Sequence, residues 1–137
     1  MIVQTQTTSF KTELYQGVHN LLTDTIKIAL YTASANLDAD TTVYSDLNEV
    51  VASGYAAGGA TMTGATLGSS GYTAYVNWAN VSWAASLTSR CALIYNASKG
   101  NKAVAVLDFG SDKTSTGTFT ITMPATTPTT ALIRSSI

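Results

Sequence analysis

Two apolar runs with a polar run between them predict a β-hairpin in the second half of the chain. Residues 91–95 and 103–107 consist of β-branched, aromatic and small side chains, and residues 96–101 supply Asn, Ser, Lys and Gly for the turn. Both runs are apolar at nearly every position, whereas a strand with one face in water alternates between apolar and polar residues. We therefore expect both faces of this hairpin to be covered, by a second sheet, a helix or another subunit.

Residues 9–22 predict a short amphipathic N-terminal helix, with Ser9 as its N-cap. Apolar side chains recur there at helical spacing, at Phe10, Leu14, Val18 and Leu21 or Leu22. Residues 24–32 alternate instead, and this predicts a strand that buries one face. That face carries Ile26, Ile28 and Leu30.

Further short strands complete the predicted fold. They are expected at residues 60–67, 72–83, 118–123 and 132–134, with turns at 68–71 and 111–117. Many short strands and one helix indicate a single mainly β domain of residues 1–137, an antiparallel β-sandwich or open barrel with one short N-terminal helix. Its predicted core consists of Ile26, Ile28, Leu30, Trp78, Trp83, Leu93, Val104, Val106, Phe119 and Ile121.

Two segments lack a pattern that would order them within one chain. Residues 1–8 are rich in Gln and Thr and are expected to form a flexible arm, and residues 33–53 form a long interaction loop with a weak helical pattern at 44–51. Loops of this length are uncommon in compact domains unless they bind something. We expect both segments to be mobile alone and ordered in an assembly. Their candidate anchors at a partner interface are Ile2, Val3, Leu37, Val43, Tyr44 and Leu47.

Charged residues make up only 11% of the chain, against about 25% in a typical soluble domain. A surface rich in Thr, Ser, Ala and Gly loses little free energy on desolvation, so we expect an assembly to cover much of it. A neutral exterior on a monomer is the alternative. The net charge of -1 without a Lys/Arg stripe argues against nucleic acid. No run approaches the ~20 apolar residues of a membrane span, and the N-terminus does not resemble a signal peptide.

The chain offers few residues for catalysis or for metal binding. Its one histidine, His19, lies beside the apolar stripe of the predicted helix, and its one cysteine, Cys91, lies in an apolar strand. We interpret His19 as a helix-surface or interface residue and Cys91 as a core residue. A small hydrolase that uses His19 remains a remote alternative. The acids of the long loop lack the spacing of a calcium site, and a solvated loop is the simpler interpretation. They are Asp38, Asp40, Asp46 and Glu49.

Two short motifs do not indicate nucleotide chemistry. Residues 108–110, Asp-Phe-Gly, match the magnesium-binding tripeptide of protein kinases, but the other kinase motifs are missing, so we interpret them as a strand end before a turn. Residues 54–59 are Gly-rich but lack the Lys of a phosphate-binding loop, and a tightly packed corner explains them better. We therefore predict no catalytic residue, no cofactor and no metal.

One combination of segments extends over most of the chain. It comprises FKTELYQGVHN at 10–20, TIKIALY at 25–31, GYAAGG at 54–59, Trp83, Arg90, IYN at 94–96 and DFG at 108–110. This combination resembles a family of small virion structural proteins from tailed bacteriophages. The resemblance implies a non-enzymatic part of the virus particle and brings no catalytic residue.

The position in the particle defines two alternatives. The first is a capsid decoration or cement protein that forms a homo-oligomer, binds other virion proteins such as the major capsid protein, and stabilises the shell. The second is a tail or head-tail adaptor component. In either case we expect a protein that is made in the host cytoplasm and incorporated into the virion, with no nucleic-acid or membrane partner.

Overall fold

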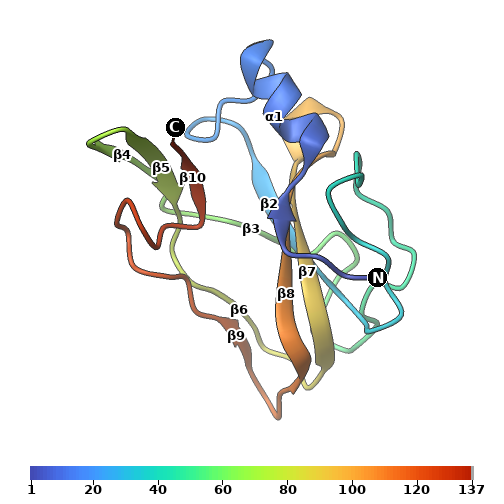
Figure 1. The fold of residues 1–137 in the computed structure, drawn as a ribbon. Coiled ribbons are helices and arrows are strands. Elements are labelled where there is room, and N and C mark those ends of the chain that lie inside the picture. The colour runs from blue at the N-terminus through green and yellow to red at the C-terminus, as the bar shows by residue number, and fades with distance from the viewer. Residues whose placement is uncertain (137) are drawn as a thin grey trace.

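The computed structural model describes residues 1–136, and its centre is a five-stranded antiparallel sheet (Figure 1). The strand order in this sheet is β1-β8-β7-β2-β3. The strands are β1 (Thr5–Gln6), β8 (Lys102–Thr114), β7 (Thr88–Asn96), β2 (Ile26–Tyr31) and β3 (Ala60–Thr61). The two longest strands, β7 and β8, pair with each other and lie in the interior of the sheet.

The predicted hairpin is confirmed as the β7–β8 pair. Its ladder runs from Thr88 opposite Thr114 to Asn96 opposite Lys102. The connection between the strands contains one short 3-10 helix, η1 (Ala97–Lys99). The polar run between the two apolar runs therefore forms the turn, as its Asn, Ser and Gly residues predict.

Strand β8 is longer than predicted. It continues through residues 108–110 to Thr114, so the Asp-Phe-Gly tripeptide does not end the strand. The turn predicted at 111–117 begins only after Thr114. The ladder shifts register between Ser89 and Cys91 of β7, where β8 takes extra residues and bulges. The bulge lets a polar, Gly-containing stretch remain in the sheet.

Two small sheets and the helix lie over one face of the central sheet (Figure 1). One sheet has the order β10-β5-β4, and the other pairs β6 with β9. These elements are α1 (Thr8–Tyr15), β4 (Thr66–Ser70), β5 (Thr73–Asn77), β6 (Val81–Trp83), β9 (Phe119–Ile121) and β10 (Ile133–Ser135). Trp83 and Phe119 from this layer join Ile28, Ile94 and Val104 of the central sheet in one large core. The described chain is thus mainly β with one α-helix, consistent with a sandwich or open barrel.

A second, smaller core lies on the opposite face of the central sheet. It contains Ala29, Tyr31, Leu93 and Val106, and it is covered by the N-terminal arm and residues 33–53 instead of a sheet (Figure 1). The prediction that the hairpin is covered on both faces is therefore confirmed. The prediction that β2 buries only one face is wrong, because the loop covers the side that carries Ala29 and Tyr31.

All of the predicted core residues are buried, and none exposes more than 8% of its surface. Trp78 and Trp83 are 5% and 6% exposed. Cys91 has no exposed surface, so its interpretation as a core residue is confirmed.

The N-terminal helix is shorter than predicted. It ends at Tyr15, and Gly17 lies just beyond it with a φ of +72°. Its N-cap is Thr7 and not Ser9, because the Thr7 hydroxyl accepts a hydrogen bond from the N–H of Phe10 at 3.2 Å. The apolar residues after Gly17 keep helical spacing without forming a helix, since Gly costs about 1 kcal/mol in a helix interior.

The strands between β3 and β6 have different limits from those predicted. The stretch 60–67 divides into β3 and the start of β4. Residues 68–71, predicted as a turn, lie mostly within β4, and the chain turns at Gly71 and Tyr72. The stretch 72–83 divides into β5 and β6. Small and polar residues occur on both sides of these boundaries, so composition does not locate them.

Gly59 provides a test of how closely the chain packs against β2. Its φ is +79°, and an added Cβ would lie 1.8 Å from the carbonyl oxygen of Ile28. We expect Gly59→Ala to lower the free energy of unfolding much more than Gly100→Ala. Gly100 is a matched control, because its φ is +68° but it has open space around it. The control should lose about 1–2 kcal/mol from backbone strain alone. Equal losses in denaturant titrations would contradict the close approach.

Candidate functional site

Residues 33–53 and the N-terminal arm are ordered against each other within the single chain. Ile2 forms a parallel bridge with Leu37, and Val43 forms an antiparallel bridge with Lys102 of β8. The N–H of Leu37 donates to the carbonyl oxygen of Met1 at 3.0 Å. Sequence patterns gave neither segment a partner inside the chain, whereas here each segment supplies hydrogen bonds to the other.

Glu49, a residue of this loop, is only 7% exposed. Its carboxylate holds the loop in place from the inner side. One carboxylate oxygen accepts the hydroxyl of Tyr44 at 2.5 Å; the other accepts the hydroxyl of Tyr55 at 2.5 Å and the N–H of Gly58 at 2.9 Å. A buried carboxylate is costly unless such donors replace water. The interpretation of Glu49 as a solvated loop acid is wrong. The weak helical pattern at 44–51 forms a turn around this carboxylate and no helix.

Two tyrosines of the central sheet fix the same loop. Tyr31 donates its hydroxyl to the carbonyl oxygen of Ser45 at 2.6 Å, and Tyr95 donates to that of Gly58 at 2.6 Å. The ring of Tyr44 stacks on the ring of Tyr95, with centroids 4.7 Å apart. The Tyr31 bond and the Tyr44–Tyr95 stack fix the loop itself. The Tyr95 bond fixes the neighbouring corner at 54–59, whose Gly58 donates to Glu49.

Burial raises the pKa of Tyr31, Tyr44, Tyr55 and Tyr95 above the ordinary value of 10.0, and the negative charge of Glu49 raises each pKa further. The four phenols therefore remain protonated near neutral pH. This keeps Tyr44 and Tyr55 as hydrogen-bond donors to the carboxylate. A phenol with a raised pKa is a poor general acid or base at neutral pH, so the chemistry of this cluster is to hold a charge in place.

His19 belongs to a second polar cluster, between the end of α1 and the β7–β8 turn. The amide nitrogen of Asn96 donates to a carboxylate oxygen of Asp24 at 2.8 Å and lies 2.9 Å from His19 Nδ1. An amide NH₂ only donates, so Nδ1 accepts and the ring proton is on Nε2, 2.9 Å from Oε1 of Glu13. The His19 side chain has no exposed surface. The helix-surface interpretation is wrong, and the buried ring has no access to a substrate.

Asp108, from the kinase-like tripeptide, has a local role in the bulge of β8. Its carboxylate lies 3.3 Å from Nε of Arg90 and accepts the N–H of Gly110 at 2.9 Å.

Burial, and then the charge of Asp108, raises the pKa of the Cys91 thiol to about 11, so this thiol is unreactive in the folded chain. Among residues 1–136, no three His, Cys, Asp or Glu side chains are grouped as metal ligands.

The outer side of residues 33–53 is the clearest candidate interface. Val43 and Leu47 are 48% and 73% exposed, and with Asp38 and Asp40 they line an open depression of about 480 Å³. We call these four residues the loop surface. Residues 33–53 contain no Lys or Arg. The loop surface therefore combines exposed apolar side chains with negative charge, on a backbone that is fixed from beneath.

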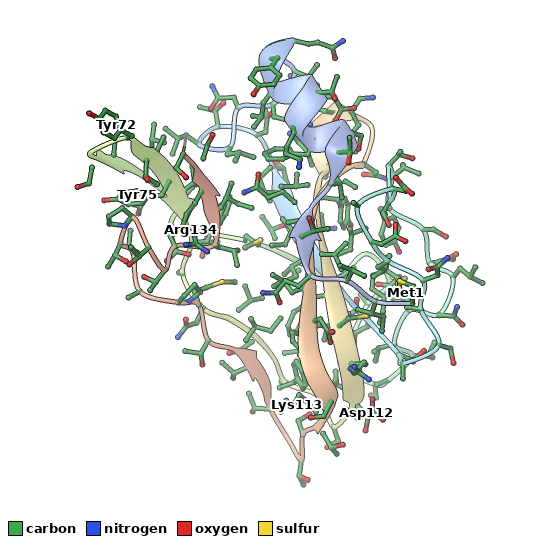
Figure 2. The ribbon with its side chains drawn as sticks, viewed as in Figure 1. Met1, Tyr72, Tyr75, Asp112, Lys113 and Arg134 are labelled. Atoms are coloured by element: carbon green, nitrogen blue, oxygen red, sulfur yellow. The ribbon has the colours of Figure 1, made fainter. Side chains whose placement is uncertain are left out.

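The predicted interface anchors divide into two groups. The exposed ones are Val3, Val43 and Leu47, and those that pack against the smaller core are Ile2, Leu37 and Tyr44. Met1 is exposed at the end of the arm, on the same side of the molecule as the loop (Figure 2). The sequence could not separate the two groups, because both occur in irregular segments without a repeating apolar pattern.

The hydrogen bonds to Glu49 predict a specific loss of stability in Glu49→Gln. The amide NH₂ of Gln places a donor where a buried tyrosine hydroxyl or backbone N–H also donates, and we expect a cost of roughly 1–3 kcal/mol. Asp46→Asn is the matched control, because Asp46 is exposed in the same loop and its change should stay within about 0.5 kcal/mol. Denaturant unfolding measures both. Equal effects would show that the Glu49 cluster contributes nothing.

The raised tyrosine pKa values predict loss of stability at alkaline pH. Above pH ~10 the unfolded chain releases phenol protons that the folded chain keeps, so the free energy of unfolding falls as pH rises. Below that pH this contribution is complete. Tyr55→Phe removes one such proton. The free energy of unfolding of this variant should therefore fall less steeply with pH than that of the wild type, and the two slopes should differ by up to about 1.4 kcal/mol per pH unit. Identical slopes for the two proteins would contradict the raised pKa of Tyr55.

Comparison of the chain with protein-family models, with curated proteins and with solved structures finds no match. Neither helix described within residues 1–136 is long and apolar enough to cross a bilayer.

Proposed function

We propose that this chain is a non-enzymatic virion structural protein of a tailed bacteriophage, in particular a capsid decoration or cement protein. In this role it is made in the host cytoplasm, forms a homo-oligomer and binds the major capsid protein. Each copy bridges neighbouring shell subunits through interfaces of roughly 800 Å² per partner, and many copies together resist expansion of the shell.

The observation that carries this proposal is the loop surface. Val43 and Leu47 are exposed on a loop that Glu49 already holds in place, so binding does not have to order it. Ordering a mobile segment would cost about 1–2 kcal/mol per residue. The neighbouring Asp38 and Asp40 favour a partner that presents apolar side chains with Lys or Arg around them.

Composition and resemblance support the same role. Few charged residues reduce the cost of covering the surface in an assembly. The segments that resemble virion proteins include the strand at 25–31 and the corner at 54–59. Both contact residues 33–53 on the inner side of the loop, through Tyr31 and Gly58. Glu49, which holds the loop, bonds Gly58 in that corner.

Copy number in purified particles is the first test. A decoration protein is expected in a fixed ratio to the major capsid protein, measured by quantitative gel analysis or mass spectrometry. A copy number that matches a single ring at the vertex or along the tail would indicate the alternative tail or adaptor role. Absence of the chain from purified particles would overturn both forms of the proposal.

Binding to shells that lack the protein tests the loop surface directly. We expect the double variant Val43→Asp and Leu47→Asp to bind at least about tenfold more weakly in co-sedimentation, because it places negative charge in the apolar contact. Both residues are exposed, so the fold should be unaffected. Tyr15→Asp is the matched control, since Tyr15 is 94% exposed on α1. Wild-type binding by the double variant would exclude the loop surface as the contact.

A further inference from the structure

The β10-β5-β4 sheet has an open edge. Strand β4 (Thr66–Ser70) pairs with β5 on one side, and no described strand pairs with it on the other. Figure 1 shows β4 as the outermost strand of this sheet, at the margin of the molecule. Because backbone hydrogen-bonding groups alternate in direction along a strand, every second residue of β4 directs its N–H and C=O away from β5. These groups are available to an added strand.

This edge lacks the charged side chains, the Pro and the bulge that often protect an edge strand. The chain contains no charged residue between Glu49 and Arg90, β4 contains no Pro, and its ladder with β5 has no bulge. Lys, Pro, bulges or a covering segment normally prevent pairing at such edges. Leu67 in β4 is 57% exposed, and Tyr72 at the tip of the hairpin is 83% exposed (Figure 2).

We propose that β4 pairs with β4 of a second copy of this chain, joining their two small sheets into one continuous antiparallel sheet about a two-fold axis. An open edge recognises an extended strand through main-chain hydrogen bonds. Charge favours a second copy as the occupant. Next to a two-fold axis each residue lies close to its own counterpart, so a charged residue there would meet its like. The uncharged stretch from 50 to 89 avoids this repulsion.

The register that pairs the whole of β4 places the axis at Gly68. Leu67 then lies opposite Ser69 of the second copy, with Cα atoms about 4.5–5.5 Å apart. This separation permits a disulfide between cysteines at the two positions. A strand of this length buries less surface than a standard interface of roughly 800 Å² per partner, so a single pairing is weak and a covalent trap is the suitable probe.

Pairing through β4 specifies how the homo-oligomer of the proposed function forms. It rests on that proposed function only for the claim that the pairing occurs in a virus particle. The two can fail separately. A chain that does not pair through β4 can still be found on the shell, and a chain that is absent from particles can still pair through β4 in solution.

Disulfide trapping tests the pairing and its register. Leu67→Cys and Ser69→Cys proteins, one of them carrying a mass tag, are mixed and oxidised. Native Cys91 does not interfere, because it is fully buried and its pKa is raised to about 11. We expect the mixed disulfide to form at least about tenfold faster than in Val51→Cys, whose side chain is 97% exposed elsewhere. Each single variant alone should react more slowly than the mixture, because identical positions lie diagonally, about 7–8 Å apart.

The result that would overturn the proposal is a mixture that reacts no faster than Val51→Cys. Equal rates in the mixture and in the separate variants would overturn the register at Gly68 and with it the proposed axis. Trapping of Ser69→Cys in particles to a different virion protein, with no trapping between copies, would assign the edge to that protein and also overturn the proposal.

Charge reversal provides an independent readout by sedimentation at high protein concentration and low salt. The double variant Leu67→Lys and Ser69→Lys should remain monomeric. Mixing it with the double variant Leu67→Glu and Ser69→Glu should restore association. Val51→Lys, the control, should associate like the wild type. Thermal unfolding of all variants should match, since Leu67 and Ser69 are exposed. Wild-type association of the doubly Lys-substituted variant would contradict pairing through β4.

Discussion

The β7–β8 hairpin carries apolar side chains on both faces, and the rest of the chain is arranged by the need to cover both. Leu93 belongs to one core and Ile94 to the other, so neighbouring residues of one strand stabilise opposite sides of the sheet. A register slip of one residue would exchange the two sets and disturb both cores. Phe10 and Trp83 belong to elements that cover one side. The N-terminal arm and the 33–53 loop cover the other, with side chains such as Ile2 and Leu37.

The two covers are built by different interactions. One is made of strands and a helix, whose backbone groups are paired by regular ladders and turns. The other is an irregular loop, and an irregular loop must find partners for its backbone and side chains one at a time. Glu49 supplies several of these partners at once, through Tyr44, Tyr55 and Gly58. The same bonds leave Val43 exposed on a fixed support, which is the property that a docking surface needs.

Sequence patterns predicted the parts of this fold that depend on neighbouring residues. The two apolar runs of the hairpin, the buried core positions and the single helix all follow from local periodicity. The loop does not, because its order depends on contacts between distant residues, such as Ile2 with Leu37 and Tyr44 with Tyr95. Glu49 was misplaced for the same reason, since nothing near it in the sequence distinguishes a buried acid from a solvated one.

Residues 33–53 form a structural layer of the single chain, with backbone hydrogen bonds to the arm and to the central sheet. Amide hydrogen exchange of the purified protein without any partner measures the protection of this loop, at the N–H groups of Leu37, Tyr44 and Val50. These donate to the carbonyl oxygens of Met1, Asn101 and Leu30 at 2.9–3.0 Å. We expect slow exchange at all three amides without any partner. Exchange at the rate of an unfolded peptide, while amides of β7 stay protected, would contradict it.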